Sequence, residues 1–259
     1  MTPPKPVLWH IGVSHYSEKV RWALAYKGIE HERRAARFPG AHMLRALWLT
    51  RGAQVTFPVI RIDGSVIGDS TAIIAALEQR HPDPPLYPPD ADERRRALAL
   101  EEWFDEELGP AIRRLAWHET TRDRKTMAAL TASNMPPALR RVGLARAGAA
   151  RFASAFVSVR FGAGSDEGAE AARAKVLAAL DRLEDELGED EYLAGGRFCV
   201  ADLTAAALFY PLVTPPQGPR LPEPPRALEE FRTPLKERRG YRWVAEMFRR
   251  HRKPGSRAG

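Results

Sequence analysis

A tight hairpin near the N-terminus restricts the fold of this chain more than any other feature. Asp63-Gly64 separates two short apolar runs, residues 58–62 and 65–67, and this dipeptide is the strongest short-range signal for a two-residue hairpin. Earlier in the chain, residues 7–11 are apolar and typical of a buried strand, and the helical pattern that follows ends at Gly28. The hairpin therefore adds antiparallel strands to an α/β unit.

The remaining N-terminal patterns fit around this hairpin. Residues 31–35 are a strand candidate and residues 44–49 a short helix candidate, while residues 73–80 carry apolar side chains on one helical face. The order is strand, helix, strand, helix, hairpin, helix. This order predicts a thioredoxin-like α/β domain with a mixed sheet.

Prolines divide the chain into two parts. We expect an α/β domain over residues 1–81, a proline-rich linker over 82–91 and an all-helical domain over 92–259. One long helix is expected from residue 92 to about residue 119, bent near Pro110. A second proline-rich segment, residues 211–225, is expected to follow the surface. Residues 120–165 and the C-terminal extension receive no role from the sequence.

Composition excludes several kinds of function. The net charge of +7 is spread over arginine clusters mixed with acids, and such charge without a recognition module does not indicate nucleic-acid binding. The lone cysteine, Cys199, excludes an intramolecular disulfide, a two-cysteine redox pair and a cysteine-rich zinc site. No run has the length and apolarity of a membrane span or signal peptide. We expect a cytoplasmic protein that binds no metal, nucleic acid or membrane.

Ser14-His15-Tyr16-Ser17 stands where the first strand gives way to the first helix. A serine there can cap the helix, since serine is preferred at that position. It can also hold a thiolate, because the first N–H groups of a helix are unpaired and its dipole favours negative charge. The residues alone leave both interpretations open.

Two further segments carry the same ambiguity. Pro58 begins a strand, as prolines commonly do, and Asp69-Ser70 precedes a helix that either residue can cap. The helix N-terminus and the Ser70 hydroxyl can equally receive a carboxylate, and Asp69 can pair with an ammonium group.

In this order, the three segments resemble the glutathione-binding half of a glutathione transferase of the bacterial-like, serine or cysteine type. Residues 192–203 are similar to the folding motif of that superfamily, with Cys199 at the cap position and Asp202 three residues later. The resemblance implies a thioredoxin-like α/β N-terminal domain followed by an all-α C-terminal domain, and a homodimer. The cysteine is then structural and buried.

The resemblance also implies how the sulfur of glutathione is held. Ser14 would donate a hydrogen bond to this sulfur and favour its thiolate form. Ser17 and Tyr16 are the alternatives for this role, and Ser17 is otherwise expected to cap the helix. His15 replaces the proline common at that place.

The rest of glutathione is assigned in the same way. The resemblance implies a cis Phe57–Pro58 bond, with the Phe57 backbone pairing with the cysteinyl unit like an added strand. Asp69 and Ser70 would bind the γ-glutamyl end, and Asp replaces the more frequent Glu there.

The implied reaction uses glutathione as co-substrate. Its thiolate would attack an electrophilic, mostly apolar small molecule, with Arg113 and Trp117 lining the second pocket. The alternative is a non-catalytic, ligand- or partner-binding protein that kept the fold. Disulfide exchange is disfavoured because positions 14 and 17 are both serine.

Overall fold

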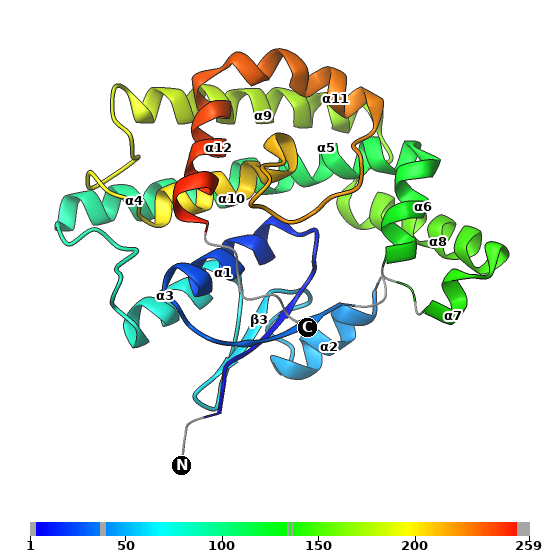
Figure 1. The fold of residues 1–259 in the computed structure, drawn as a ribbon, viewed down its shortest axis with the longest axis horizontal. Coiled ribbons are helices and arrows are strands. Elements are labelled where there is room, and N and C mark those ends of the chain that lie inside the picture. Colours follow the sequence, from blue (N-terminus) through cyan, green and yellow to red (C-terminus); the bar gives the residue numbers. More distant parts are fainter. Residues whose placement is uncertain (1–3, 37–39, 134, 136, 253–259) are drawn as a thin grey trace.

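The N-terminal part of the chain folds around a four-stranded sheet in the order β2-β1-β3-β4 (Figure 1). A computed structural model describes residues 4–36, 40–133, 135 and 137–252. β1 pairs in parallel with β2 and antiparallel with β3, and β3 and β4 form the predicted hairpin. Asp63 and Gly64 have φ of 48° and 78° in its turn, as a type I′ turn requires. The elements of this part are β1 (Val7–His10), α1 (His15–Tyr26), β2 (Glu32–Ala35), α2 (Ala41–Leu49), β3 (Val59–Ile62), β4 (Ser65–Gly68) and α3 (Ser70–Arg80).

Helices cover both faces of this sheet. Successive strand residues point to opposite faces, so Leu8 and Ile60 join the core formed with α1 and α3. Trp9 and Val59 point the other way and pack with Leu49 of α2. The mixed sheet and its helices confirm the predicted thioredoxin-like α/β fold.

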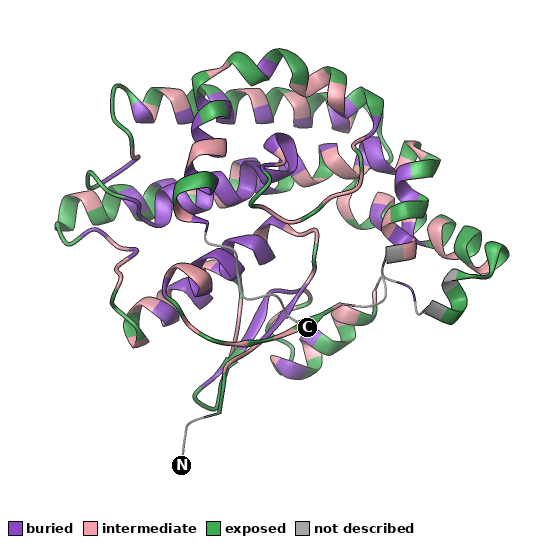
Figure 2. Cartoon of the chain, in the orientation of Figure 1, coloured by how far each residue is buried: buried purple, intermediate pink, exposed green. Residues whose placement is uncertain are grey.

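Everything after the sheet is helical. The helix α10 lies at the centre of this part, and all of its residues are buried (Figure 2). It packs against α1, so both domains contribute to one large core. The elements are α4 (Ala91–Trp103), η1 (Phe104–Leu108), α5 (Gly109–Arg122), α6 (Arg124–Ser133), α7 (Pro137–Arg140), α8 (Gly143–Phe161), α9 (Asp166–Leu187), α10 (Val200–Val213), α11 (Arg226–Arg232), η2 (Thr233–Glu237) and α12 (Arg239–His251).

The start of α10 follows the predicted folding motif. The carboxylate of Asp202 accepts hydrogen bonds of 2.8 Å from the N–H groups of Cys199 and Leu193. Cys199 is buried, and burial raises the pKa of its thiol. The thiol therefore stays protonated, in agreement with the structural role that the sequence predicts.

The expected long helix over residues 92–119 is present as three consecutive helical segments, α4, η1 and α5. The helix widens into a π-helical turn at η1, before Pro110 is reached. The Tyr16 hydroxyl donates to the Asp105 carbonyl at 2.7 Å, so the neighbouring domain pairs with a carbonyl of this wide turn. Gly109 leaves room for it, since a Cβ there would lie 2.0 Å from the Tyr16 hydroxyl oxygen. With this i→i+5 spacing the N–H of residue 110 would bond the Asp105 carbonyl, and Pro110 has no N–H, so the Tyr16 hydroxyl supplies the missing donor.

The second proline-rich segment also differs from its prediction. The helix α10 continues through Pro211 to Val213, and the segment after it does not merely follow the surface. Leu221 and Pro222 of this segment line a cavity, with their apolar side chains turned toward the other apolar residues that line it. In the described part of the chain, no helix combines the length and apolarity needed to cross a membrane.

Candidate functional site

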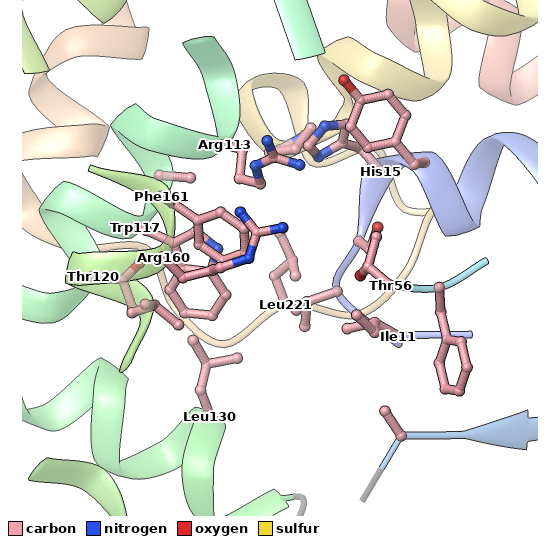
Figure 3. A pocket seen from close by; sticks show the side chains of 18 of the residues that line it. Ile11, His15, Thr56, Arg113, Trp117, Thr120, Leu130, Arg160, Phe161 and Leu221 are labelled. Carbon is pink, nitrogen blue, oxygen red and sulfur yellow. The ribbon is translucent and has the colours of Figure 1, made fainter. Parts of the chain in front are cut away.

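A cavity of about 950 Å³ lies between the α/β domain and the helical domain (Figure 3). It brings together residues that are far apart in the sequence. Ser17 does not line it. The predicted site residues that do are Ser14, Tyr16, Phe57, Pro58, Asp69, Ser70, Arg113 and Trp117.

Ser14 is the N-cap of α1. Its Oγ accepts a hydrogen bond of 3.2 Å from the Ser17 N–H. The prediction that Ser17 caps the helix is therefore wrong. Ser17 is fully buried, and its own Oγ accepts a hydrogen bond from the Ile11 N–H at 3.2 Å. A serine hydroxyl both accepts and donates, so the cap bond leaves the hydrogen of Ser14 free to donate into the cavity.

The loop before Ser14 is fixed from two sides. The guanidinium of Arg21 donates to the carbonyls of Ile11 and Gly12 at 3.2 and 3.0 Å. The Tyr210 hydroxyl, from the buried helix α10, donates to the Val13 carbonyl at 2.6 Å. These contacts hold the loop although it lacks the proline expected beside Ser14. Neither residue was predicted, because both act from elements whose packing the sequence does not show.

The Phe57–Pro58 peptide bond is cis, as the resemblance implies. Both residues are buried against the cavity. The β3 strand begins only at Val59, so the backbone of Phe57 lies outside the sheet ladder. An extended ligand could pair with this backbone as an added strand does.

Asp69 and Ser70 form the start of α3. Asp69 has φ of 70°, and its Oδ1 accepts hydrogen bonds from the N–H groups of Thr71 and Ala72 at 3.0 and 3.1 Å. Oδ2 makes no hydrogen bond to any residue within the described ranges. Ser70 is buried and lines the cavity at the same helix end. This turn can therefore offer one carboxylate oxygen and the N-terminal end of a helix to a ligand.

A buried lysine ties this turn to the helical domain. The Lys19 Nζ lies 2.8 Å from Glu101 Oε1 and 2.5 Å from Asp105 Oδ2, and it donates to Thr71 Oγ1 at 3.0 Å. The Thr71 hydroxyl in turn donates to Asp105 at 2.7 Å. Burial raises the pKa of Glu101. The sequence offered only one signal for this network, a lysine among the apolar residues of α1.

Tyr16 and His15 also face the cavity. The Tyr16 hydroxyl is engaged by the Asp105 carbonyl, and burial raises the pKa of its phenol. A phenol that donates to a carbonyl and stays protonated is less available than Ser14 to hold a sulfur. Burial, and to a lesser extent the neighbouring Arg113, lower the pKa of His15 to about 3. The imidazole is therefore neutral at ordinary pH.

Aromatic and cationic side chains form another part of the lining. Trp117 and Phe161 stack with ring centroids 6.4 Å apart and planes 9° apart. The guanidinium groups of Arg113 and Arg160 lie 4.7 and 5.4 Å from the centroid of the Phe161 ring. Figure 3 shows these four side chains grouped together, with His15 beside Arg113. Arg160 and Phe161 end α8, in the region to which the sequence assigned no role.

Metal ligands are not part of this arrangement. Among the described residues, no group of three or more His, Cys, Asp or Glu side chains is placed to hold a metal ion. The cavity instead combines hydroxyls, helix ends, arginines and aromatic rings.

Two family models match the chain. The one described as glutathione S-transferase, N-terminal domain, matches residues 8–85, and the one described as glutathione S-transferase, C-terminal domain, matches residues 166–236. Together they span more than half of the chain. The chain belongs to the glutathione S-transferase family. The family to which the sequence bears its resemblance is thereby confirmed.

The curated relatives of this glutathione S-transferase family member match only part of the chain. Maleylacetoacetate isomerase of Dictyostelium discoideum is 34% identical over 112 residues, which cover 42% of this chain and 51% of that protein. Maleylpyruvate isomerase of Ralstonia sp is 35% identical over 92 residues, which cover 36% and 42%. The chain thus spans about half the length of the curated relatives it matches.

Among solved structures, human glutathione transferase theta-2 superposes with a TM-score of 0.61. It is 21% identical, and the superposition covers 94% of this chain and 82% of the human one. That structure is described as a complex with glutathione and an unknown ligand. At this identity the likeness concerns the fold, and it agrees with the two-domain architecture.

Proposed function

We propose that this protein binds glutathione in the cavity between its domains and holds the sulfur as a thiolate for attack on an electrophilic small molecule. The observation that carries the proposal is the Ser14 hydroxyl. It caps α1, is oriented by the Ser17 N–H, and keeps its hydrogen free in the cavity. Family membership supports glutathione as the thiol.

Two physical effects would favour the thiolate at this position. A hydrogen bond donated to a charged sulfur stabilises the charged form, and the N-terminal end of α1 adds the positive end of the helix dipole. A free thiol has a pKa of about 8.5, and helix N-termini lower it. Ser14 is therefore the proposed thiolate-stabilising residue. Of the two alternatives, Tyr16 lines the cavity and Ser17 does not.

The rest of glutathione would lie along the edge of the α/β domain. The backbone N–H and C=O of Phe57, next to Pro58, would pair with the cysteinyl unit. The γ-glutamyl end would lie at the start of α3, where Ser70 and the helix end receive its carboxylate. The Oδ2 atom of Asp69 would accept from its ammonium group.

Two reactions begin with the same attack. In conjugation, the sulfur forms a bond to carbon and a leaving group, such as chloride, departs with its bonding electrons. In cis–trans isomerisation, the sulfur adds to a conjugated C=C bond, whose electrons move to a carbonyl oxygen. Rotation follows, and the returning electrons expel the thiolate. We include the second reaction because the curated relatives are named as isomerases.

Glutathione consumption separates these reactions. We expect calorimetry to detect glutathione binding to wild type. With 1-chloro-2,4-dinitrobenzene, conjugation consumes one glutathione per product. With maleylpyruvate, the compound in the name of the Ralstonia relative, isomerisation consumes none. Glutathione binding with no turnover of either compound would favour the non-catalytic alternative. Failure to bind glutathione would refute the proposal.

A further inference from the structure

Two arginines in the cavity have no acidic partner among the described residues. Arg113 comes from α5 and Arg160 from α8, and both line the cavity beside Phe161. No ion pair joins either of them to a carboxylate within the described ranges. Other arginines of the helical domain are paired: Arg122 with Asp166, and Arg173 with Glu119. The two cavity arginines therefore lack the counter-charge that their neighbours have.

Arg113 is the more unusual of the two because it is largely removed from water. Its Nε atom is buried and makes no hydrogen bond to any residue that the structure describes. Its guanidinium lies 5.7 Å from the centroid of the Tyr16 ring and 4.7 Å from that of Phe161. Burial lowers the pKa of Arg113, and the nearby Arg160 and Arg114 lower it further. A desolvated cation among other cations is costly unless an anion joins it.

His15 adds a second buried polar atom at the same place. It lies beside Arg113 (Figure 3), and its Nε2 atom is buried with no hydrogen-bond partner among the described residues. An imidazole is either neutral or positively charged, so it supplies no counter-charge to Arg113. A ligand that reaches Arg113 can therefore also meet a free imidazole nitrogen.

Five acids line the cavity, and within the described ranges none of them forms an ion pair with Arg113 or Arg160. Glu101 and Asp105 contact Lys19, and Asp69 caps α3 through Oδ1. Glu102 and Glu106 are the other two. None of the carboxylates that line the cavity is among the charges that shift the pKa of Arg113. Among the described residues, Arg113 therefore has no carboxylate partner.

We infer that Arg113, aided by Arg160, binds a carboxylate of the second substrate. This rests on the proposed function and deepens it: the electrophile is a carboxylic acid with a flat conjugated part, rather than a wholly apolar molecule. A guanidinium offers parallel N–H donors that match the two oxygens of a carboxylate. The stacked rings of Trp117 and Phe161 offer a flat apolar surface beside it.

Binding of unreactive probes tests this without turnover. We would titrate glutathione-saturated protein with 3-nitrobenzoate and with 3-nitrobenzamide, which has a similar shape and no charge. Wild type should bind the benzoate about tenfold more tightly, as a charged hydrogen bond implies. Arg113→Met should abolish this preference, and Arg160→Met should reduce it. Arg113→Lys should keep part of it, because the charge remains but the planar fork is lost.

Arg151→Met is the matched control. Arg151 is an exposed arginine of the same helix as Arg160 and does not line the cavity, so the preference should persist when this charge is lost. Equal binding of the two probes to wild type overturns the inference, and this result needs no variant to fold. A preference that survives in folded Arg113→Met also overturns it.

Glutathione calorimetry keeps the two proposals apart. If glutathione binds but the probes bind alike, the carboxylate site fails and the proposed function stands. If glutathione does not bind, the probes are titrated alone. A benzoate preference that depends on Arg113 then supports the carboxylate site, while the proposed function fails.

Discussion

Lys19→Met should destabilise the protein more than any surface substitution. The Lys19 side chain is fully buried, and that of Glu101 is 1% exposed. Removing the lysine leaves Glu101 buried without its cation, while Asp105 keeps only the Thr71 hydroxyl. Breaking a buried ion pair in this way costs about 3–5 kcal/mol. A domain has about 5–15 kcal/mol of stability, so the loss takes a large part of the total.

The size of this loss should depend on pH. Burial already raises the pKa of Glu101, and Lys19 opposes that shift. Without Lys19 the folded-state pKa rises further above the unfolded value. A group of this kind contributes stability below its unfolded pKa and loses it as pH rises through the folded pKa. Lys19→Met should therefore lose less stability, relative to wild type, at about pH 5 than at about pH 7.

Urea unfolding followed by circular dichroism measures both effects. Lys5→Met is the control, because Lys5 and Glu30 form an ion pair whose side chains are 70% and 79% exposed. Such surface pairs contribute about 0–1 kcal/mol. The double variant Lys19→Met/Glu101→Leu should recover part of the loss, since it removes the buried charge as well. The reasoning is refuted if Lys19→Met has the same free energy of unfolding as Lys5→Met. It is also refuted if Lys19→Met loses the same amount of stability, relative to wild type, at both pH values.

Three further predictions concern glutathione binding, acid stability and assembly. Asp69→Asn or Ser70→Ala should raise KM for glutathione with little change in kcat, because each loses a contact made equally in ground and transition states; unchanged KM in both would contradict the assignment. Burial lowers the pKa of His15 to about 3, so its contribution to stability is present above its unfolded pKa and lost as pH falls. His15→Leu should therefore lose about 2 kcal/mol less stability than wild type between about pH 7 and 5 in urea unfolding, and equal losses would contradict this. We also propose a homodimer, with the thiol-binding domain of one subunit against the long helices of the other. Sedimentation at micromolar concentration should give twice the 28.9 kDa chain mass, and the monomer mass would refute the dimer.

Local signals in the sequence predicted the α/β domain and the start of α10 well. Asp63-Gly64 specifies its turn through backbone conformations that few other residues adopt, and Asp202 accepts from the N–H groups that its capping motif leaves free. These features depend on neighbours within a few residues. Sequence spacing is therefore sufficient to find them.

Features that depend on tertiary contacts were missed or misplaced. The helix α1 is capped by Ser14 and not by Ser17, because the Ser17 hydroxyl is turned toward the Ile11 N–H. The π-helical turn directly before Pro110 was not predicted, and neither was the Tyr16 hydroxyl that reaches its Asp105 carbonyl from the other domain. Arg160 meets Arg113 only when α8 packs beside α5. None of these contacts follows from periodicity or propensity along one segment.

The account depends most on Ser14, and the thiolate absorbance of bound glutathione tests that residue directly. The absorbance would be followed against pH for wild type, Ser14→Ala and Tyr16→Phe. Wild type should titrate below the solution value of about 8.5. Ser14→Ala should remain folded, since a lost cap costs about 1 kcal/mol, and its midpoint should move toward that value while Tyr16→Phe titrates like wild type. A Ser14→Ala complex that titrates like wild type would contradict the account.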